Sequence, residues 1–168
     1  AAREAAAAWG AGSTGSRLTT GTTPLHRELE ARLAAFKHTE DAVFFSSGYA
    51  AAVGVIPALV GREDLILSDE LNHACLIDGC RLSRATVRIY RHGDPDHAAE
   101  LLRERDRFRR ALLVTDGVFS MDGDLAPLPE LADLCERADT WLMVDDAHGT
   151  GVLGATGTGT VEHFCLQG

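Results

Sequence analysis

The run from Trp141 to Gly149 joins an apolar segment to two carboxylates and an imidazole. Its first four residues, Trp-Leu-Met-Val, predict a buried strand, and Asp145, Asp146 and His148 follow where that strand should end. In open α/β sheets, ligands bind beyond the carboxyl ends of the strands, so acid and base groups placed there indicate a functional site. For this run taken alone, a strand that stops in a polar turn remains the alternative.

A second polar cluster, Ser46 to Tyr49, lies between a strand predicted over 42–45 and a helix predicted over 48–60. The start of a helix presents N–H groups with a partial positive charge, and Gly48 lets a ligand approach the backbone closely. Such a turn is suited to binding a phosphate group. An ordinary turn with a helix cap explains the same residues equally well.

Two more clusters follow further predicted strands. Asn72 and His73 come after one of them, and the Asp- and Gly-rich segment 115–124, which includes Ser120, leaves another. Singly, a structural histidine and an acidic turn account for these residues. Together, the four clusters at strand ends predict one site along one edge of a sheet.

Two nucleotide-binding motifs are excluded by their context. The run from Gly10 to Gly15 matches G-x-G-x-x-G, but an alanine-rich helix precedes it and more loop follows, whereas a Rossmann fingerprint needs a strand before it and a helix after it. The segment Asp145 to His148 is similar to the second motif of P-loop ATPases. Their phosphate loop needs a lysine, and the one lysine here, Lys37, lies inside a predicted helix. We expect a mobile or ligand-covering loop over 10–23 instead.

Composition narrows the class of protein. The chain has 168 residues, 45% of them hydrophobic, and a formal net charge of −9, which argues against nucleic-acid and membrane partners. No segment approaches the ~20 apolar residues of a membrane span, and residues 1–9 do not form a secretion signal, so we expect a cytoplasmic location. His73, Cys75 and Cys80 match no standard zinc spacing, so we expect reduced thiols and no metal.

Helices and strands alternate along the chain. Helices are predicted over 1–9, 24–37, 48–60, 72–82, 94–104 and 127–138, and strands over 42–45, 65–67, 86–90, 111–115 and 141–145. Strands joined by helices need crossover connections, which predicts an α/β fold with a helix-covered, mostly parallel sheet. In the second helix, Leu25, Leu29, Leu33 and Phe36 form the apolar stripe and Glu30 lies outside it. We find no domain linker, and the glycine-rich tail after Gly149 adds no helix or strand to close the fold.

Six segments, in the same order, resemble the α-oxoamine synthases, which are pyridoxal-phosphate (PLP) enzymes of the aspartate-aminotransferase fold type, fold type I. They are Gly15–Gly21 with His26, Phe45–Tyr49, Ser68–His73, Val118–Asp124, Val144–Gly149 and Glu162–Phe164. The resemblance implies a three-layer αβα large domain over 1–168, incomplete at its C-terminal end and without the small C-terminal domain. It also implies pyridoxal 5'-phosphate as the cofactor and a homodimer.

The same resemblance implies a role for each matched residue. Asp145 would pair with the pyridinium nitrogen and favour the protonated ring, which withdraws electrons from the substrate's α-carbon. His148 would bond the phenolic oxygen, and Ser120 would help to fix the cofactor. His73, the catalytic candidate, would stack on the ring and contact substrate. Near the phosphate end, the implied cofactor-binding residues are Gly48 and Tyr49.

The implied reaction joins L-alanine to a pimeloyl thioester with loss of carbon dioxide, and glycine-using relatives remain an alternative. The family's Schiff-base lysine normally follows some tens of residues after the His148 motif, and Lys37 stands in the wrong motif to replace it. We therefore expect the 168-residue chain alone to form no Schiff base. A lysine-less, non-catalytic subunit is the competing hypothesis. Two positions depart from relatives: Ala52, where asparagine is common, and Asp116, where some carry glutamate.

Overall fold

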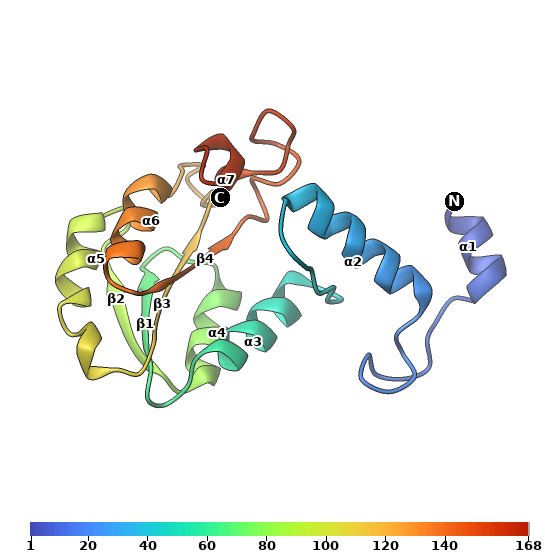
Figure 1. Ribbon diagram of the computed structural model, residues 1–168, viewed down its shortest axis with the longest axis horizontal. Coiled ribbons are helices and arrows are strands. Elements are labelled where there is room, and N and C mark those ends of the chain that lie inside the picture. The colour runs from blue at the N-terminus through green and yellow to red at the C-terminus, as the bar shows by residue number, and fades with distance from the viewer. Residues whose placement is uncertain (168) are drawn as a thin grey trace. The chain divides into compact units, whose positions relative to one another are not determined.

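Four parallel strands form the sheet of the computed structural model, which describes residues 1–167 (Figure 1). They are β1 (Leu65–Asp69), β2 (Thr86–Tyr90), β3 (Ala111–Asp116) and β4 (Trp141–Asp145), in the order β2-β1-β3-β4. Ile66 of β1 lies opposite Val87 of β2 on one side and Leu112 of β3 on the other. Because all the pairs are parallel, the carboxyl ends of the strands meet at one edge of the sheet.

Helices cover both faces of this sheet (Figure 1). They are α3 (Gly48–Leu59), α4 (Ala74–Ser83), α5 (Pro95–Leu102) and α6 (Leu128–Arg137). Ile66 belongs to the same core cluster as Ile56 of α3 and Leu76 of α4, while its neighbours Leu65 and Leu67 pack on the opposite face with α5 and α6. The alternation of side chains along β1 thus builds two cores, and the predicted three-layer αβα fold is confirmed.

The remaining helices are α1 (Ala2–Trp9), α2 (Pro24–Lys37), the short 3-10 helix η1 (Arg105–Arg107) and α7 (Thr160–His163). The chain divides into two compact units, one ending at Phe44 and the other beginning at Phe45. The sheet and its four covering helices belong to the second unit. Across residues 1–167, no helix has the length and apolar character needed to cross a membrane.

Polar side chains determine where two of the covering helices begin. The Oγ of Ser47 accepts a hydrogen bond from the N–H of Ala50 at the start of α3 (3.1 Å). At the start of α5, Asp94 accepts from the N–H of His97 (2.9 Å), and Pro95 is the first helical residue, as predicted. Each cap satisfies an N–H group that has no partner within its helix.

Replacing Ser47 by alanine is expected to lower the free energy of unfolding by about 1 kcal/mol, because the Ala50 N–H loses its acceptor. Urea denaturation followed by circular dichroism measures this change. Ser46→Ala, at the exposed neighbouring position, is the matched control and should stay within about 0.5 kcal/mol of the parent. An equal loss in both variants would show that the Ser47 cap contributes nothing specific.

The strand predicted over 42–45 is wrong, and so is the outer position predicted for Glu30. Residues 42–45 form no strand, and the N–H of Phe44 donates instead to Oε1 of Glu30 (3.0 Å). Glu30 is only 4% exposed and pairs with Arg17 (2.6 Å), which also donates to the carbonyl of Phe44. A buried ion pair, rather than a ladder of backbone hydrogen bonds, holds this segment.

Two apolar surfaces are more exposed than the sequence predicted. The stripe of α2 keeps its predicted spacing, but its four residues are each 37–39% exposed in this chain: Leu25, Leu29, Leu33 and Phe36. The strand predicted at 141–145 is confirmed, but its predicted burial is wrong, because β4 is the edge strand of the sheet and Trp141 is 45% exposed. An edge strand has a neighbour on one side only, and Arg110 lies over the Trp141 ring at 5.0 Å.

Candidate active site

Two carboxylates lie side by side where the sequence predicted a site. Asp116 ends β3 and Asp145 ends β4, and the two residues are opposite each other in the parallel register. Burial raises the pKa of Asp116, and the negative charge of Asp145 acts in the same direction. The N–H of His73 donates to Oδ2 of Asp116 (2.7 Å) and opposes that rise.

The ring of His73 is fixed by the first turn of α4. Nδ1 accepts from the N–H of Cys75 (3.2 Å) and lies 2.9 Å from the Cys75 Sγ, so a neutral ring carries its proton on Nε2. The Sγ of Cys75 is 3.9 Å from Oδ2 of Asp145, whose Oδ1 accepts from the N–H of Ala147 (3.1 Å). His73, Cys75, Asp116 and Asp145 therefore form one cluster, drawn from the start of α4 and the ends of β3 and β4.

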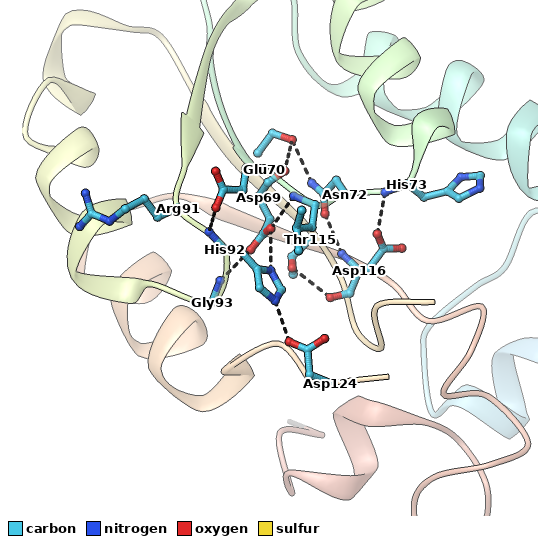
Figure 2. Close-up of polar contacts among 12 residues, drawn as sticks. Asp69, Glu70, Asn72, His73, Arg91, His92, Gly93, Thr115, Asp116 and Asp124 are labelled. Carbon is cyan, nitrogen blue, oxygen red and sulfur yellow. Dashed lines mark hydrogen bonds and ion pairs between the residues drawn. The ribbon is translucent and has the colours of Figure 1, made fainter. Parts of the chain in front are cut away.

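Asn72 ties β1 to β3 beside this cluster (Figure 2). Its Nδ2 donates to the carbonyl of Val114 (2.8 Å) and to Oγ of Ser68 (2.9 Å), and its Oδ1 accepts from the N–H of Asp116 (2.9 Å). The side chain is 4% exposed and uses both ends of its amide. Asn72 thus fixes the backbone at the point where Asp116 leaves the sheet.

The other predicted site residues lie at exposed positions. Tyr49 is 53% exposed, and its hydroxyl donates to Oδ2 of Asp78 (3.2 Å), a bond that raises the pKa of Tyr49. Gly48 begins α3, and an added Cβ there would meet no atom within 4 Å. His148 is exposed and lies close enough to Asp116 to counteract the rise in the pKa of that carboxyl. Ser120 is exposed on the turn after β3 and, within residues 1–167, bonds to none of the others.

The sequence analysis missed His92, which follows β2. Its ring bridges Asp69 and Asp124, two carboxylates on different segments (Figure 2). The polar run from Arg91 to Asp94 follows β2 in the same way as the predicted clusters follow β1, β3 and β4. A polar run directly after a predicted strand was therefore the signal in the sequence that could have predicted a fifth cluster at the same edge of the sheet.

Asp146 and Glu162 organise the segment after β4, which was predicted to contain no helix but includes α7. Oδ1 of Asp146 accepts from the hydroxyl (2.7 Å) and the N–H (3.1 Å) of Thr160, the first residue of α7. Glu162 accepts from the N–H and hydroxyl groups of Thr156 and Thr158. Although burial acts in the opposite direction, these donors lower the pKa of Glu162 to about 2. Asp146 therefore supports the loop that follows the site.

Among residues 1–167, no group of three or more His, Cys, Asp and Glu side chains could hold a metal ion. The cysteines Cys75, Cys80 and Cys135 are buried and unpaired, and Cys165 is exposed and unpaired. Burial raises the pKa of Cys75, so its Sγ stays a protonated thiol beside Asp145.

Comparison with known proteins identifies the family. The model for aminotransferases of class I and II matches residues 1–166, and the chain belongs to this family. It is 58% identical to 8-amino-7-oxononanoate synthase of Geobacter sulfurreducens and 54% identical to that of Symbiobacterium thermophilum. Each alignment covers 98% of this chain and 42% of the relative, so the chain spans less than half the length of these relatives.

Solved structures define the class within that family. A serine palmitoyltransferase variant from S. paucimobilis with a bound PLP–myriocin aldimine has a TM-score of 0.94 and 35% identity, and the match covers 99% of this chain and 42% of that one. 8-Amino-7-oxononanoate synthase from Francisella tularensis has a TM-score of 0.78 and 32% identity, covering 97% and 44%. The resemblance to the α-oxoamine synthases and to PLP fold type I is confirmed, and these findings indicate PLP as the cofactor.

Proposed function

We propose that this chain is the PLP-binding large domain of an α-oxoamine synthase that joins L-alanine to a pimeloyl thioester, with loss of carbon dioxide, to form 8-amino-7-oxononanoate for biotin synthesis. The cluster of His73, Asp116 and Asp145 at the carboxyl edge of the sheet carries this proposal. The relatives named for this activity, at 49–58% identity, support the choice of substrates. The acyl carrier is coenzyme A or a carrier protein, and the protein works as a cytoplasmic homodimer by analogy with the family.

The donor groups at the sheet edge fit PLP. Asp145 offers a carboxylate to a protonated ring nitrogen, and His73 offers a flat ring whose orientation is fixed. The first turn of α3 offers N–H groups to a phosphate, and Gly48 leaves the space in front of them open. When bound, PLP withdraws electrons from the α-carbon of an amino acid.

Each residue then has a task that its surroundings support. Asp145 holds a proton on the ring nitrogen through its charge, and the Ala147 N–H keeps its Oδ1 in place. His73 presents the face of its ring, and its Nε2 carries the proton because Nδ1 accepts from Cys75. We assign His148 to the phenolic oxygen of the cofactor, and we assign to Ser120 a part in fixing the cofactor.

The rate of coenzyme A release tests which pair of substrates the protein uses. The complete protein, given PLP, is expected to release coenzyme A from pimeloyl-CoA with L-alanine at least about tenfold faster than from acetyl-CoA with glycine, measured with a thiol reagent. The 168-residue chain alone, whose one lysine is Lys37, is the comparison and should release none and form no borohydride-stable PLP adduct at Lys37.

A second candidate is another α-oxoamine synthase, such as glycine C-acetyltransferase. It is favoured by the better superposition on serine palmitoyltransferase, 0.94 against 0.78 for the 8-amino-7-oxononanoate synthase. Faster release with glycine and acetyl-CoA would support it and reject the alanine reaction. A complete protein that binds PLP but releases no free thiol from acetyl-CoA, pimeloyl-CoA or a pimeloyl carrier protein would instead support the non-catalytic subunit.

A further inference from the structure

His92 lies between two carboxylates at the sheet edge (Figure 2). Its Nδ1 is 3.0 Å from Oδ1 of Asp69, and its Nε2 is 2.6 Å from Oδ2 of Asp124. The side chain of Asp69 is 1% exposed and that of His92 is 22% exposed. The edge of the His92 ring contacts Phe119, with centroids 4.4 Å apart and planes at 83°. The ring is therefore held on three sides.

The two hydrogen bonds of this ring require a particular protonation state. Asp69 is already an acceptor for the N–H groups of Leu71 (2.9 Å) and Gly93 (3.1 Å), as an ionised carboxylate is. An ionised carboxylate cannot donate, so with Asp69 and Asp124 both ionised the two bonds exist together only when both ring nitrogens of His92 carry a proton. A neutral imidazole has one N–H and would leave one carboxylate facing a lone pair.

Asp124 belongs to a hairpin, residues 117–125, that follows β3. Val118 and Leu125 form an antiparallel bridge, and within it the N–H of Phe119 donates to the carbonyl of Asp124 (3.0 Å). Ser120 lies in the turn of this hairpin. The bond from His92 to Asp124 thus connects the segment that carries Ser120 to the buried end of β1.

We propose that His92, in its doubly protonated form, is a positioning residue that latches the 117–125 hairpin to Asp69 and so sets the place of Ser120. When the ring loses one proton, one of its two bonds is lost and the hairpin is released from β1. The assignment of Ser120 to the cofactor rests on the proposed function, whereas the latch itself does not.

The charges around the ring favour the latched state. Asp69 and Asp124 face the two ring nitrogens of His92, and Glu70 accepts from the backbone N–H of His92 (2.9 Å). The nearby Arg91 is paired with Asp94 (2.7 Å). Burial lowers the pKa of His92, but the two bonded carboxylates outweigh it and raise the net value. The latch is then complete below the ordinary histidine pKa of about 6.5 and is lost as pH rises through the raised value.

Hydrogen exchange of the complete protein, read by mass spectrometry on peptides covering 117–125, tests the latch. Asp124→Asn keeps the shape of the side chain and an acceptor oxygen but removes the charge, so the bond from His92 is weaker because a hydrogen bond to a charged group is about twice as strong as a neutral one. Hairpin amides should therefore exchange about tenfold faster than in the parent at about pH 6. After correction for intrinsic rates, exchange in the parent should approach that in the variant at about pH 9, while exchange in the variant should change less between the two pH values because its latch is already weakened. Asp122→Asn, exposed in the same hairpin, is the matched control and should behave like the parent.

Equal exchange in the parent and in Asp124→Asn at about pH 6 would overturn the latch. PLP affinity, measured on the same samples by fluorescence titration, tests separately whether the latch sets the place of Ser120. A several-fold weaker affinity in Asp124→Asn supports the placing of Ser120, and an unchanged affinity alongside faster exchange rejects it. If the parent itself binds no PLP, the proposed function fails, and the exchange rates still decide the latch.

Discussion

Replacing Asp145 by asparagine is expected to weaken PLP binding by about 10- to 100-fold, because a hydrogen bond to a charged group contributes about 1.5–3 kcal/mol. Asparagine has the same shape and can still accept from the Ala147 N–H (3.1 Å in the parent), so the fold should persist. It cannot balance the charge of a protonated ring nitrogen, and the activity of the complete protein should fall by at least the same factor. Fluorescence titration with PLP measures the affinity.

The matched control for this variant is Asp133→Asn. Asp133 is an exposed carboxylate on α6 that pairs with Arg137, so the same chemical change is made away from the sheet edge. Its PLP affinity should equal that of the parent. If Asp145→Asn also binds PLP as tightly as the parent, then Asp145 does not face the ring nitrogen and the cofactor lies differently at this edge.

The sequence predicted most elements of the fold because their buried faces are encoded locally. In α6, Leu128, Leu131, Leu134 and Cys135 recur at helical spacing, and all four are buried as predicted. In its sequence pattern, the apolar run at 42–45 looks the same as a strand. Its Phe44 N–H, however, bonds to the carboxylate of Glu30, 14 residues away, rather than to a neighbouring strand. A hydrogen bond from the backbone to so distant a side chain leaves no periodic signal, so the prediction failed there.

The site was predicted as separate clusters, but not as a network. That Asp116 and Asp145 lie opposite each other depends on the register of β3 and β4, which the sequence does not encode locally. Asn72 was named in the sequence, but its bonds to Val114 and Asp116 cross from one strand to the next. His92 escaped notice because its two partners are 23 and 32 residues away in the chain.

Replacing Gly79 by alanine is expected to lower the free energy of unfolding by about 1–3 kcal/mol, the range for overpacking a tight core. At an exposed helix position, replacing glycine by alanine would raise the free energy of unfolding by about 1 kcal/mol, so the sign of the measured change already distinguishes a tightly packed position from an exposed one. A Cβ at Gly79 would lie 2.8 Å from the carbonyl oxygen of Ala52 and 2.8 Å from Cδ1 of Ile56. Ile56 is fully buried, and the Ala52 oxygen moves only if α3 moves as a whole.

Urea denaturation measures this loss, and Gly48→Ala is the control for stability, because a Cβ at Gly48 meets nothing within 4 Å and should cost no stability. Overpacking at Gly79 should also affect the candidate active site, because α3 begins with Gly48 and Tyr49 and α4 begins directly after His73. A Gly79 variant that pushes the two helices apart should therefore lengthen the bond between Tyr49 and Asp78, 3.2 Å in the parent, and weaken PLP binding as well. A Gly79→Ala protein as stable as the parent would mean that α3 and α4 do not pack this closely, and the positions of both helix starts at the sheet edge would have to be revised.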